Sequence, residues 1–545
     1  MVDLVARGGP VWTGRSDRPD ARAVALDAGR VVAVDTEAEA LIDSSTRVVD
    51  LEGRLAVPGF IDAHVHPVQA GLDRLRCDLS QVTDEQDAYV HAVAAYARSR
   101  PGADWVLGGG WSMSGFPGGL PTASALERAV ADRPVYLPNR DRHGAWVNSR
   151  ALKLAGIDAA TVDPADGRIE RDASGAPTGM LHEAAMDLVG RMVPPPTEDE
   201  QLRALLLAQT ELHAYGVVAW QDAIVGDYAG SGDVFGVHVR AAREQRLTAR
   251  VTGALWWERE RGVEQLAGLA ERRRAGAAGR FRPLAVKIMV DGVVESFTAT
   301  LREPYLDGHG GPTRNSGNGF VDAGALRAAV VALDAAGFQV HVHAIGDRAV
   351  RDSLDAFEAA RGANGASGGR HHLAHLQLVH PDDLGRFAAL DVTANMQALW
   401  ACHEPQMDQL TLPFLGAERA GWQYPFGDLH RLGTRLACGS DWPVSTPDPL
   451  QAVKVAVTRA EPGTDGPPLL PEQALDLATA LRAYTAGSAY TTHDDEAGVL
   501  RPGARGDLVV LDRDIFAGPP AAIDQAQVDL TAVDGVVVYD RLRDG

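Results

Sequence analysis

Apolar and polar residues alternate along short segments at both ends of the chain. In the first 57 residues this pattern occupies DLVARGGPVW, AVALDAGRVVAV and RVVDLEGRLAV, and in the last 50 it occupies GDLVVLDRD, AQVDLTAV and GVVVYDRLR. The alternation predicts strands. A few strands at either end alone would leave unpaired sheet edges. We therefore predict one composite β-sandwich domain from residues 1–57 and 496–545, with two unrelated hairpins as the alternative.

Between residues 58 and 495, short apolar segments rich in β-branched residues alternate with helical patterns such as 322–337 and 381–390. Parallel strands joined by crossover helices produce this order. Eight such strands predict an α/β fold, a closed (β/α)8 TIM barrel, rather than an open doubly wound sheet. The expected strands are 59–66, 216–222, 249–257, 284–292, 338–346, 370–378, 391–397 and 436–444.

About 150 residues separate the first two expected strands, which is far longer than an ordinary loop of a barrel. This stretch contains WVLGGGW, VYLPNRDRHGAWVNS and the proline-rich VPPPTEDE. We predict an insertion of about residues 67–215 that lies at the barrel mouth and shapes a substrate pocket. The GGG at 108–110 leads into Trp111 and not into a helix, so a dinucleotide site is not indicated.

Composition excludes several classes of protein. Hydrophobic residues make up 45% of the 545 residues and charged residues 23%, as in globular proteins. The net charge of −21 would repel phosphate backbones and anionic lipids, so we expect neither nucleic-acid nor membrane partners. Three cysteines without a CxxC pair provide neither a disulfide framework nor a thiolate zinc site. No long apolar run is present, and we expect a cytoplasmic protein.

Metal-binding side chains stand at the carboxyl ends of several expected strands. They are His64, His66, Lys287, His343, His375 and Asp441. In a barrel these strand ends converge. His64 and His66 also share one strand face, so both imidazoles can bind the same divalent cation. A lone HxH pair would be explained as well by hydrogen-bonded polar residues, but the joint pattern predicts a metal site.

The ordered motifs PGFIDAHVHP, VHAIGDRAV, HLAHLQLVHPDDLGRF and GSDWPV resemble those of the amidohydrolase superfamily. They are most similar to the branch that includes N-substituted formamide deformylases. The resemblance spans nearly the whole chain, including NRDRHGAWVNS in the insertion. It implies a metal-dependent hydrolase with one or two divalent ions, Zn²⁺ being the expected metal, although iron, manganese and nickel accept the same ligands.

The resemblance also implies how the ligands divide. His64, His66 and Asp441 would bind one ion, and His343 and His375 a second. Lys287 would carry a CO₂-derived carbamate that bridges both ions and offsets their repulsion. Only a primary amine forms this carbamate, and Lys287 is one of three lysines among 52 basic residues. The alternatives are a single-metal site, or a lysine paired with Asp291 or Glu295.

Other polar residues are assigned less directly. The resemblance places Arg140, His143 and Asn148 over the pocket, and we expect them to contact substrate. Glu183 could reach the site, although a charge on a helix face is the favoured interpretation. In the strand segments, His341 is either a partner of a ligand or a structural histidine.

The expected reaction follows from the metal. A divalent cation lowers the pKa of bound water toward about 7, which provides hydroxide at neutral pH. We expect this hydroxide to attack the carbonyl of a linear N-acyl or N-formyl amide, with Asp441 moving the proton to the departing nitrogen. GWSMSG does not match the serine nucleophile motif G-x-S-x-G. The alternatives are a cyclic amidase, a carbamate or ester hydrolase, a related decarboxylase or isomerase, and a non-catalytic binding protein. The substrate is a small molecule in each enzymatic case, and a homodimer is one assembly we consider.

Overall fold

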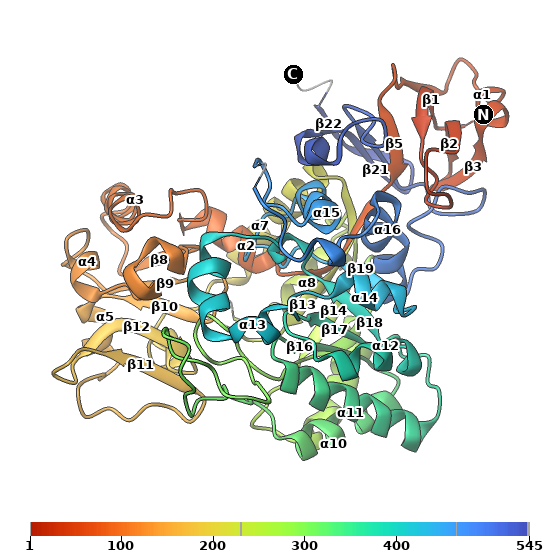
Figure 1. The fold of residues 1–545 in the computed structure, drawn as a ribbon. Coiled ribbons are helices and arrows are strands. Elements are labelled where there is room, and N and C mark those ends of the chain that lie inside the picture. Colours follow the sequence, from red (N-terminus) through yellow and green to blue (C-terminus); the bar gives the residue numbers. More distant parts are fainter. Residues whose placement is uncertain (1, 229–231, 465, 542–545) are drawn as a thin grey trace.

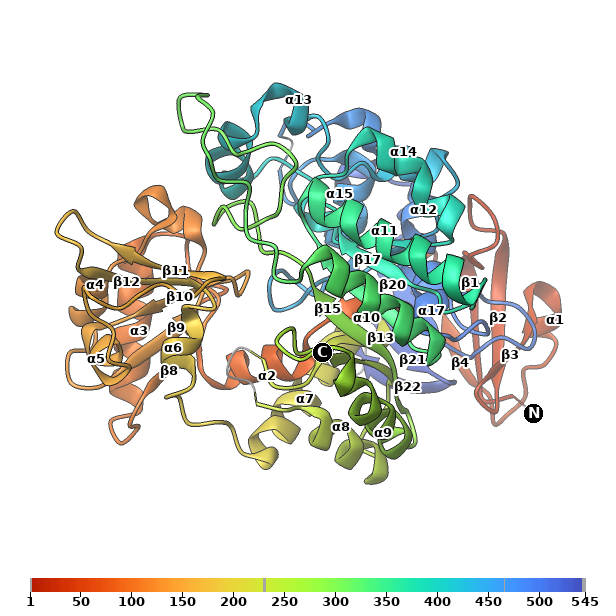
Figure 2. The same ribbon diagram turned by 90° about the horizontal axis from the view of Figure 1, so that it is seen from below.

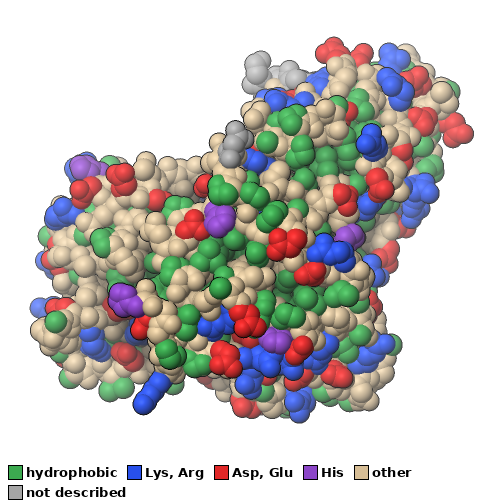
Figure 3. Space-filling view, viewed as in Figure 1, with side chains coloured by type: hydrophobic (Ala, Val, Ile, Leu, Met, Phe, Trp, Pro, Cys, Tyr) green, Lys and Arg blue, Asp and Glu red, His purple; other side chains and the backbone are tan. Residues whose placement is uncertain are grey.

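The computed structural model describes residues 2–228, 232–464 and 466–541. Three sheets organise the chain: a central parallel sheet, a sheet built from the insertion, and a sheet built from both chain ends (Figures 1 and 2). Acidic and basic side chains are interspersed over the face seen in Figure 3. Within these ranges, no helix combines the length and the apolar character that crossing a bilayer requires.

The central sheet is the nearly closed, eight-stranded parallel barrel that the hydrophobic pattern predicts. Its strands are β6 (Phe60–Val65), β13 (Val217–Val225), β14 (Arg250–Trp256), β15 (Phe281–Met289), β16 (Gln339–Ala344), β17 (His372–His375), β18 (Thr393–Met396) and β19 (Leu436–Cys438). Each strand pairs with the next in chain order. The strands are almost entirely buried because helices cover their outer face, which explains their continuous apolar character.

The crossover helices follow the strands as βα units require. They include α8 (Phe235–Arg243), α9 (Leu266–Gly276), α10 (Ala323–Ala335), α11 (Asp347–Asn364), α12 (Leu384–Leu390), α13 (Gly416–Ala420) and α14 (Phe426–Arg431). The helices α10 and α11 pack on each other and on β16. After the last strand come α15 (Pro449–Thr458), α16 (Leu477–Arg482) and α17 (Ser488–Thr491).

The first and last barrel strands are joined at their carboxyl ends. Backbone N–H of Asp441 donates to the carbonyl of His64 at 2.7 Å, and N–H of His66 donates to the carbonyl of Trp442 at 2.9 Å. The segment after β19 therefore continues the ladder along β6. This closure places the residues that follow both strands next to each other.

The insertion contributes a six-stranded sheet beside the barrel (Figure 1). Its strands, in spatial order, are β11 (Gly167–Arg171), β12 (Pro177–Glu183), β10 (Gly144–Val147), β9 (Val135–Pro138), β8 (Val106–Gly109) and β7 (Cys77–Asp78). With them lie α3 (Gln86–Ser99), α4 (Ala123–Glu127), α5 (Ser149–Leu154) and α6 (Met186–Gly190). Trp111, Phe116 and Trp146 are in the apolar core of this unit. At its two ends, α2 (Pro67–Leu75) and α7 (Glu198–Ala214) pack on each other, and α7 also packs on β13.

Strands from both chain ends form the third sheet. It contains β1 (Leu4–Val11), β2 (Ala21–Asp27), β3 (Arg30–Val34), β4 (Arg47–Asp50), β5 (Leu55–Pro58), β20 (Leu508–Leu511), β21 (Val528–Val533) and β22 (Val536–Asp540), with α1 (Asp35–Glu39) following β3. The antiparallel pair β5 and β20 connects the two ends. Folding of these strands as a separate domain with the predicted boundaries stays a prediction, and residues 542–545 of the predicted segment 496–545 lie outside the described ranges.

A largely buried arginine, whose side chain is 12% exposed, links the barrel to the sheet of the chain ends. Arg250 of β14 reaches Asp507, just before β20, at 3.2 Å, Asp534 at 3.3 Å and Asp494 at 3.1 Å. Asp507 is 1% exposed. Its other partner within the described chain is the backbone N–H of Asp534. The two carboxylates at 494 and 534 have additional arginine partners, so Asp507 depends most on this contact.

We expect Arg250→Ala to lower the free energy of unfolding by about 3–5 kcal/mol, because it leaves the Asp507 carboxylate buried without a cation. Denaturant unfolding followed by circular dichroism measures this change. Arg274→Ala, which breaks the exposed pair with Glu271, is the control and should change stability by less than about 0.5 kcal/mol. A loss below about 1 kcal/mol for Arg250→Ala would contradict a structural role of this link.

Candidate metal centre

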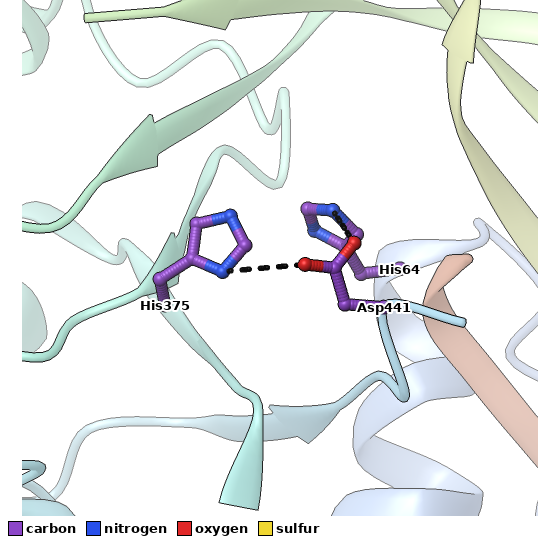
Figure 4. A group of neighbouring side chains, drawn as sticks. All are labelled: His64, His375 and Asp441. Atoms are coloured by element: carbon purple, nitrogen blue, oxygen red, sulfur yellow. Dashed lines mark ion pairs between the residues drawn. The ribbon is translucent and has the colours of Figure 1, made fainter. Parts of the chain in front are cut away.

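Three side chains from different barrel strands meet at the carboxyl end of the barrel. They are His64 of β6, His375 of β17 and Asp441, which follows β19 (Figure 4). Each provides a ligand atom, and these atoms lie within 4.8 Å of one another. Asp441 Oδ1 is 3.2 Å from His64 Nε2, and Oδ2 is 4.0 Å from His375 Nδ1. The Asp441 carboxylate lies between the two imidazole rings, as Figure 4 shows.

The other two predicted histidine ligands border this cluster. His66 Nε2 is 2.9 Å from Asp441 Oδ1. The His343 ring lies with its centroid 4.3 Å from that of His375, while its Nε2 is 3.4 Å from the carbonyl oxygen of Gly292. The strand ends that the sequence predicts to converge therefore do so.

Lys287 completes the cluster without an ion pair. The residue is 1% exposed, and its Nζ lies 3.4 Å from His64 Nε2 and 3.5 Å from His341 Nε2. In the described part of the chain, no carboxylate lies within 4.0 Å of this amine. Asp291 instead accepts backbone hydrogen bonds, including those from Ile345 at 3.0 Å and Gly346 at 2.9 Å. The alternative of a lysine paired with Asp291 or Glu295 is therefore wrong.

His341 is within hydrogen-bonding distance of the candidate metal ligand His64. Its Nε2 lies 3.0 Å from Nδ1 of His64, and its ring is fully buried. A hydrogen bond to the second ring nitrogen fixes the orientation and tautomer of a metal-binding imidazole. This arrangement leaves His64 Nε2 directed toward Asp441. The structure thus favours one of the two alternatives that the sequence leaves open.

Local sequence explains why these residues are held so closely. The buried carboxylate of Asp62 accepts hydrogen bonds from the backbone N–H of His64 at 3.0 Å and of Ser440 at 3.1 Å. A Cβ at Gly439 would lie 2.5 Å from His64 Cβ, so only glycine permits this approach. Asp441 has φ of +54°, in the left-handed region that is strained for a non-glycine residue. Strain of this kind is typical of functional sites.

The donor set fits a divalent metal ion. Asp441 Oδ1 and His375 Nδ1 are buried and, among the described residues, have no hydrogen-bond partner. Leaving such atoms unsatisfied is costly, and coordination to metal would satisfy both. Burial, followed by the charge of Lys287, lowers the pKa of His64 to about 3, so its imidazole is neutral as a metal ligand must be. Burial would raise the pKa of Asp441, but the imidazoles of His64 and His66, which contact its carboxylate, hold it well below its usual value.

A small inner cavity of about 40 Å³ lies against the cluster and brings in His143 from the insertion. His143 Nδ1 is 2.9 Å from Glu183 Oε2, and Thr298 Oγ1 donates to Glu183 Oε1 at 2.6 Å. Burial alone would lower the pKa of His143, but the Glu183 carboxylate raises it to about 9. The prediction that Glu183 is a charge on a helix face is wrong, because it ends β12 with a buried side chain.

The other two residues predicted to contact substrate, Asn148 and Arg140, lie in different surroundings. Asn148 caps α5, and its side chain bonds only to backbone groups, including those of Ala151, Val135 and Arg133. It is fully buried and does not line the inner cavity, so the structure gives its predicted substrate contact no support, and that contact stays a prediction. Arg140 borders a second cavity of about 470 Å³ and pairs with Asp84 at 3.2 Å.

Sequence reasoning missed Trp400, whose ring stacks on His375 with centroids 5.4 Å apart and planes 5° apart. This tryptophan follows β18 and lines both the inner cavity and the cavity of about 470 Å³. No motif marks it. The one available signal was its position after an expected strand, where pocket residues of a barrel are found.

Comparisons with known proteins identify the family of this chain. A family model described as "Amidohydrolase family" matches residues 47–539. The chain is 31% identical to the putative amidohydrolase YtcJ of Bacillus subtilis, over 91% of both chains. It is 28% identical to the N-substituted formamide deformylase of Arthrobacter pascens, over 99% of both. A solved structure of an uncharacterised metal-dependent hydrolase from Pyrococcus furiosus has 26% identity and a TM-score of 0.69, covering 95% of this chain and 99% of that one. The chain belongs to the amidohydrolase family, and it is a hydrolytic enzyme.

Proposed function

We propose that the enzyme hydrolyses the C–N bond of a linear N-acyl or N-formyl amide with a divalent metal bound at the cluster. The observation that carries this proposal is the buried Asp441 carboxylate, which lies among imidazoles with one oxygen unsatisfied. The printed name of the Arthrobacter pascens relative, which is an N-substituted formamide deformylase, supports an amide as the substrate.

In this proposal His64, His66 and Asp441 hold one ion, and His343 and His375 hold a second. Zn²⁺ is the proposed metal because imidazole and carboxylate ligands suit it. Lys287 would carry a carbamate, which would supply a further anionic ligand for the metal. Burial lowers the pKa of Lys287 to about 7, so a large fraction of the amine is uncharged near neutral pH. The uncharged amine is the form that adds to CO₂.

A bound divalent cation supplies a hydroxide nucleophile at neutral pH and polarises a carbonyl oxygen. Asp441 performs the proton transfer. Its Oδ1 would bind the metal, and its other oxygen, Oδ2, which lies 4.0 Å from His375 Nδ1, can accept the proton of the nucleophile. The same atom then delivers that proton to the departing nitrogen, which leaves as a neutral amine.

His143 orients the substrate carbonyl. Its Nδ1 is fixed by Glu183, and its ring lies 5.5 Å from that of His343 in the wall of the inner cavity. The imidazole carries a proton because Glu183 raises its pKa to about 9. A charged N–H donor beside the reacting carbonyl stabilises negative charge that develops on oxygen.

We expect chelation to abolish activity and added Zn²⁺ to restore it, and steady-state hydrolysis of N-formyl amides measures both changes.

We expect Asp441→Asn to keep the metal while kcat falls on the order of 10³-fold. Elemental analysis measures the metal content, and steady-state hydrolysis of N-formyl amides measures kcat. Asp382→Asn, a change in an exposed carboxylate, is the control. A metal-loaded Asp441→Asn variant with near wild-type turnover would refute the proton-transfer role.

Lys287→Arg should remove the carbamate, because a guanidinium does not add CO₂, and both metal content and activity should fall. In ¹³C-bicarbonate, the wild-type enzyme should give a carbamate carbon signal by NMR that the variant lacks. Lys153→Arg, at an exposed lysine, should retain signal, metal and activity. Full metal content and activity in Lys287→Arg would be incompatible with a carbamate ligand.

Glu183→Gln should lower kcat/KM by about 10- to 100-fold while metal content stays unchanged, since the His143 imidazole loses its anionic partner. Glu170→Gln is a matched control. Glu170 lies 3.1 Å from His182 Nε2 in the same sheet, and neither residue lines the inner cavity. Equal losses in the two variants would indicate a purely structural role for Glu183.

A further inference from the structure

The cavity of about 470 Å³, here called the outer chamber, adjoins the metal centre. It shares Asp141, Val293, Ile345, Trp400 and Val444 with the inner cavity. The two spaces therefore meet along a common wall that ends at the ligand cluster. A substrate whose amide lies at the metal centre can extend into the outer chamber, so the walls of the chamber select the substrate.

Three carboxylates line the outer chamber: Asp141, Glu295 and Glu404. Glu295 Oε1 accepts a hydrogen bond from Thr411 Oγ1 at 2.7 Å, and Asp141 Oδ1 accepts one from the backbone N–H of His143 at 2.9 Å. Within the described ranges, no lysine or arginine lies within 4.0 Å of any of the three. Burial, with the charges of Asp141 and Glu404, raises the pKa of Glu295 to about 7, and burial also raises the pKa of Glu404.

The two arginines of the outer chamber are occupied elsewhere. Arg140 pairs with both oxygens of Asp84 at 3.2 Å. Arg74 pairs with Asp78 at 2.5 Å and with Glu211 at 2.6 Å. Each guanidinium therefore has an acidic partner other than Glu295 and Glu404, although the charge of Arg140 also opposes the rise in the pKa of Glu404. The chamber as a whole is electronegative, which disfavours an anionic substrate.

The rest of the wall suits an organic cation. Trp400, Tyr424, Leu399 and Met407 provide aromatic and apolar surface. Aromatic faces attract ammonium groups, and adjacent carboxylates strengthen this attraction. Gln377 also lines the chamber at 3% exposure, and its Nε2 has no hydrogen-bond partner among the described residues. An amide N–H donates, so this unsatisfied group indicates a hydrogen-bond acceptor, such as a carbonyl oxygen, on a ligand at the same wall.

We propose that the outer chamber binds a protonated amine, so that the preferred substrates are amides with an ammonium group on the part remote from the scissile bond. Glu295 and Glu404 neutralise the ammonium, and Trp400 and Tyr424 enclose the carbon chain that carries it. This inference rests on the proposed amide hydrolysis for its biological meaning. The binding of the cation itself does not depend on that reaction.

The first test measures binding to the metal-loaded enzyme. Benzylamine and benzyl alcohol have similar shapes and differ in charge at about pH 8, so calorimetric titration of both isolates the effect of the ammonium. We expect benzylamine to bind at least about tenfold more tightly, and we expect Glu295→Gln and Glu404→Gln each to reduce this ratio several-fold. Glu418→Gln, at an exposed glutamate of α13, should leave it unchanged.

The outcomes are decisive in both directions. Equal binding of the two probes, no benzylamine binding at millimolar concentration, or a ratio that both glutamine variants leave intact would overturn the proposal. Thermal unfolding of each variant identifies any folding defect, and if one glutamine variant is defective, the other one tests the proposal. The measured quantity is the ratio of benzylamine affinity to benzyl alcohol affinity within one variant, so a general loss of binding would not be mistaken for the expected result.

A second arm uses hydrolysis. Matched N-formyl amides with an ammonium, a hydroxyl or a carboxylate at the remote end should rank in that order of kcat/KM. If no amide of the panel is hydrolysed while benzylamine still binds through Glu295 and Glu404, the proposed function fails and the cation site stands. If all three are hydrolysed equally, the proposed function stands and the cation preference is wrong.

Discussion

The burial of the Asp441 carboxylate among imidazoles is the constraint on which the site depends. A carboxylate removed from water is costly unless cations or hydrogen-bond donors surround it. Here the nearest groups are His64 Nε2 at 3.2 Å and His66 Nε2 at 2.9 Å, yet Oδ1 has no partner with hydrogen-bond geometry within the described chain. A divalent cation between these atoms resolves the cost, and the barrel supplies the rigid frame that holds them in place.

That frame is built from interactions that are not themselves catalytic. Asp62 binds the backbone on both sides of the barrel closure, and Gly439 permits the close approach of β19 to His64. His341 orients the ring of His64 from the neighbouring part of the barrel. The geometry of the ligands therefore depends on contacts made by residues that never touch substrate. Such support limits how far a ligand can move without loss of function.

The barrel and the meeting of His64, His375 and Asp441 could be predicted because both follow from local pattern. Buried parallel strands are continuously apolar, and a histidine or aspartate at the end of such a strand is conspicuous. The position of Glu183 was predicted wrongly because TGMLHE lacks the alternation of apolar and polar residues that marks an exposed strand. Its strand, β12, is evident only from its pairing in the sheet of the insertion. Asn148 is ambiguous for another reason, since the same residue type caps helices and binds ligands. The outer chamber was not predictable, because Glu295 and Glu404 come from separate loops whose meeting depends on tertiary packing.

The insertion contributes a side chain to the surroundings of the ligand cluster. His143 reaches the ligand cluster from the sheet of the insertion, whereas Trp400 reaches it from the segment after β18. In the proposed function, the metal centre would define the reaction class, and the inserted and loop residues would define which molecule reaches it. Anomalous X-ray diffraction from crystals of the Zn²⁺-loaded enzyme tests this account most directly. We expect a zinc peak at about 2.0–2.2 Å from ligand atoms of His64, His66 and Asp441. A cluster without a peak in fully loaded protein, or a zinc ion bound only elsewhere, would contradict it.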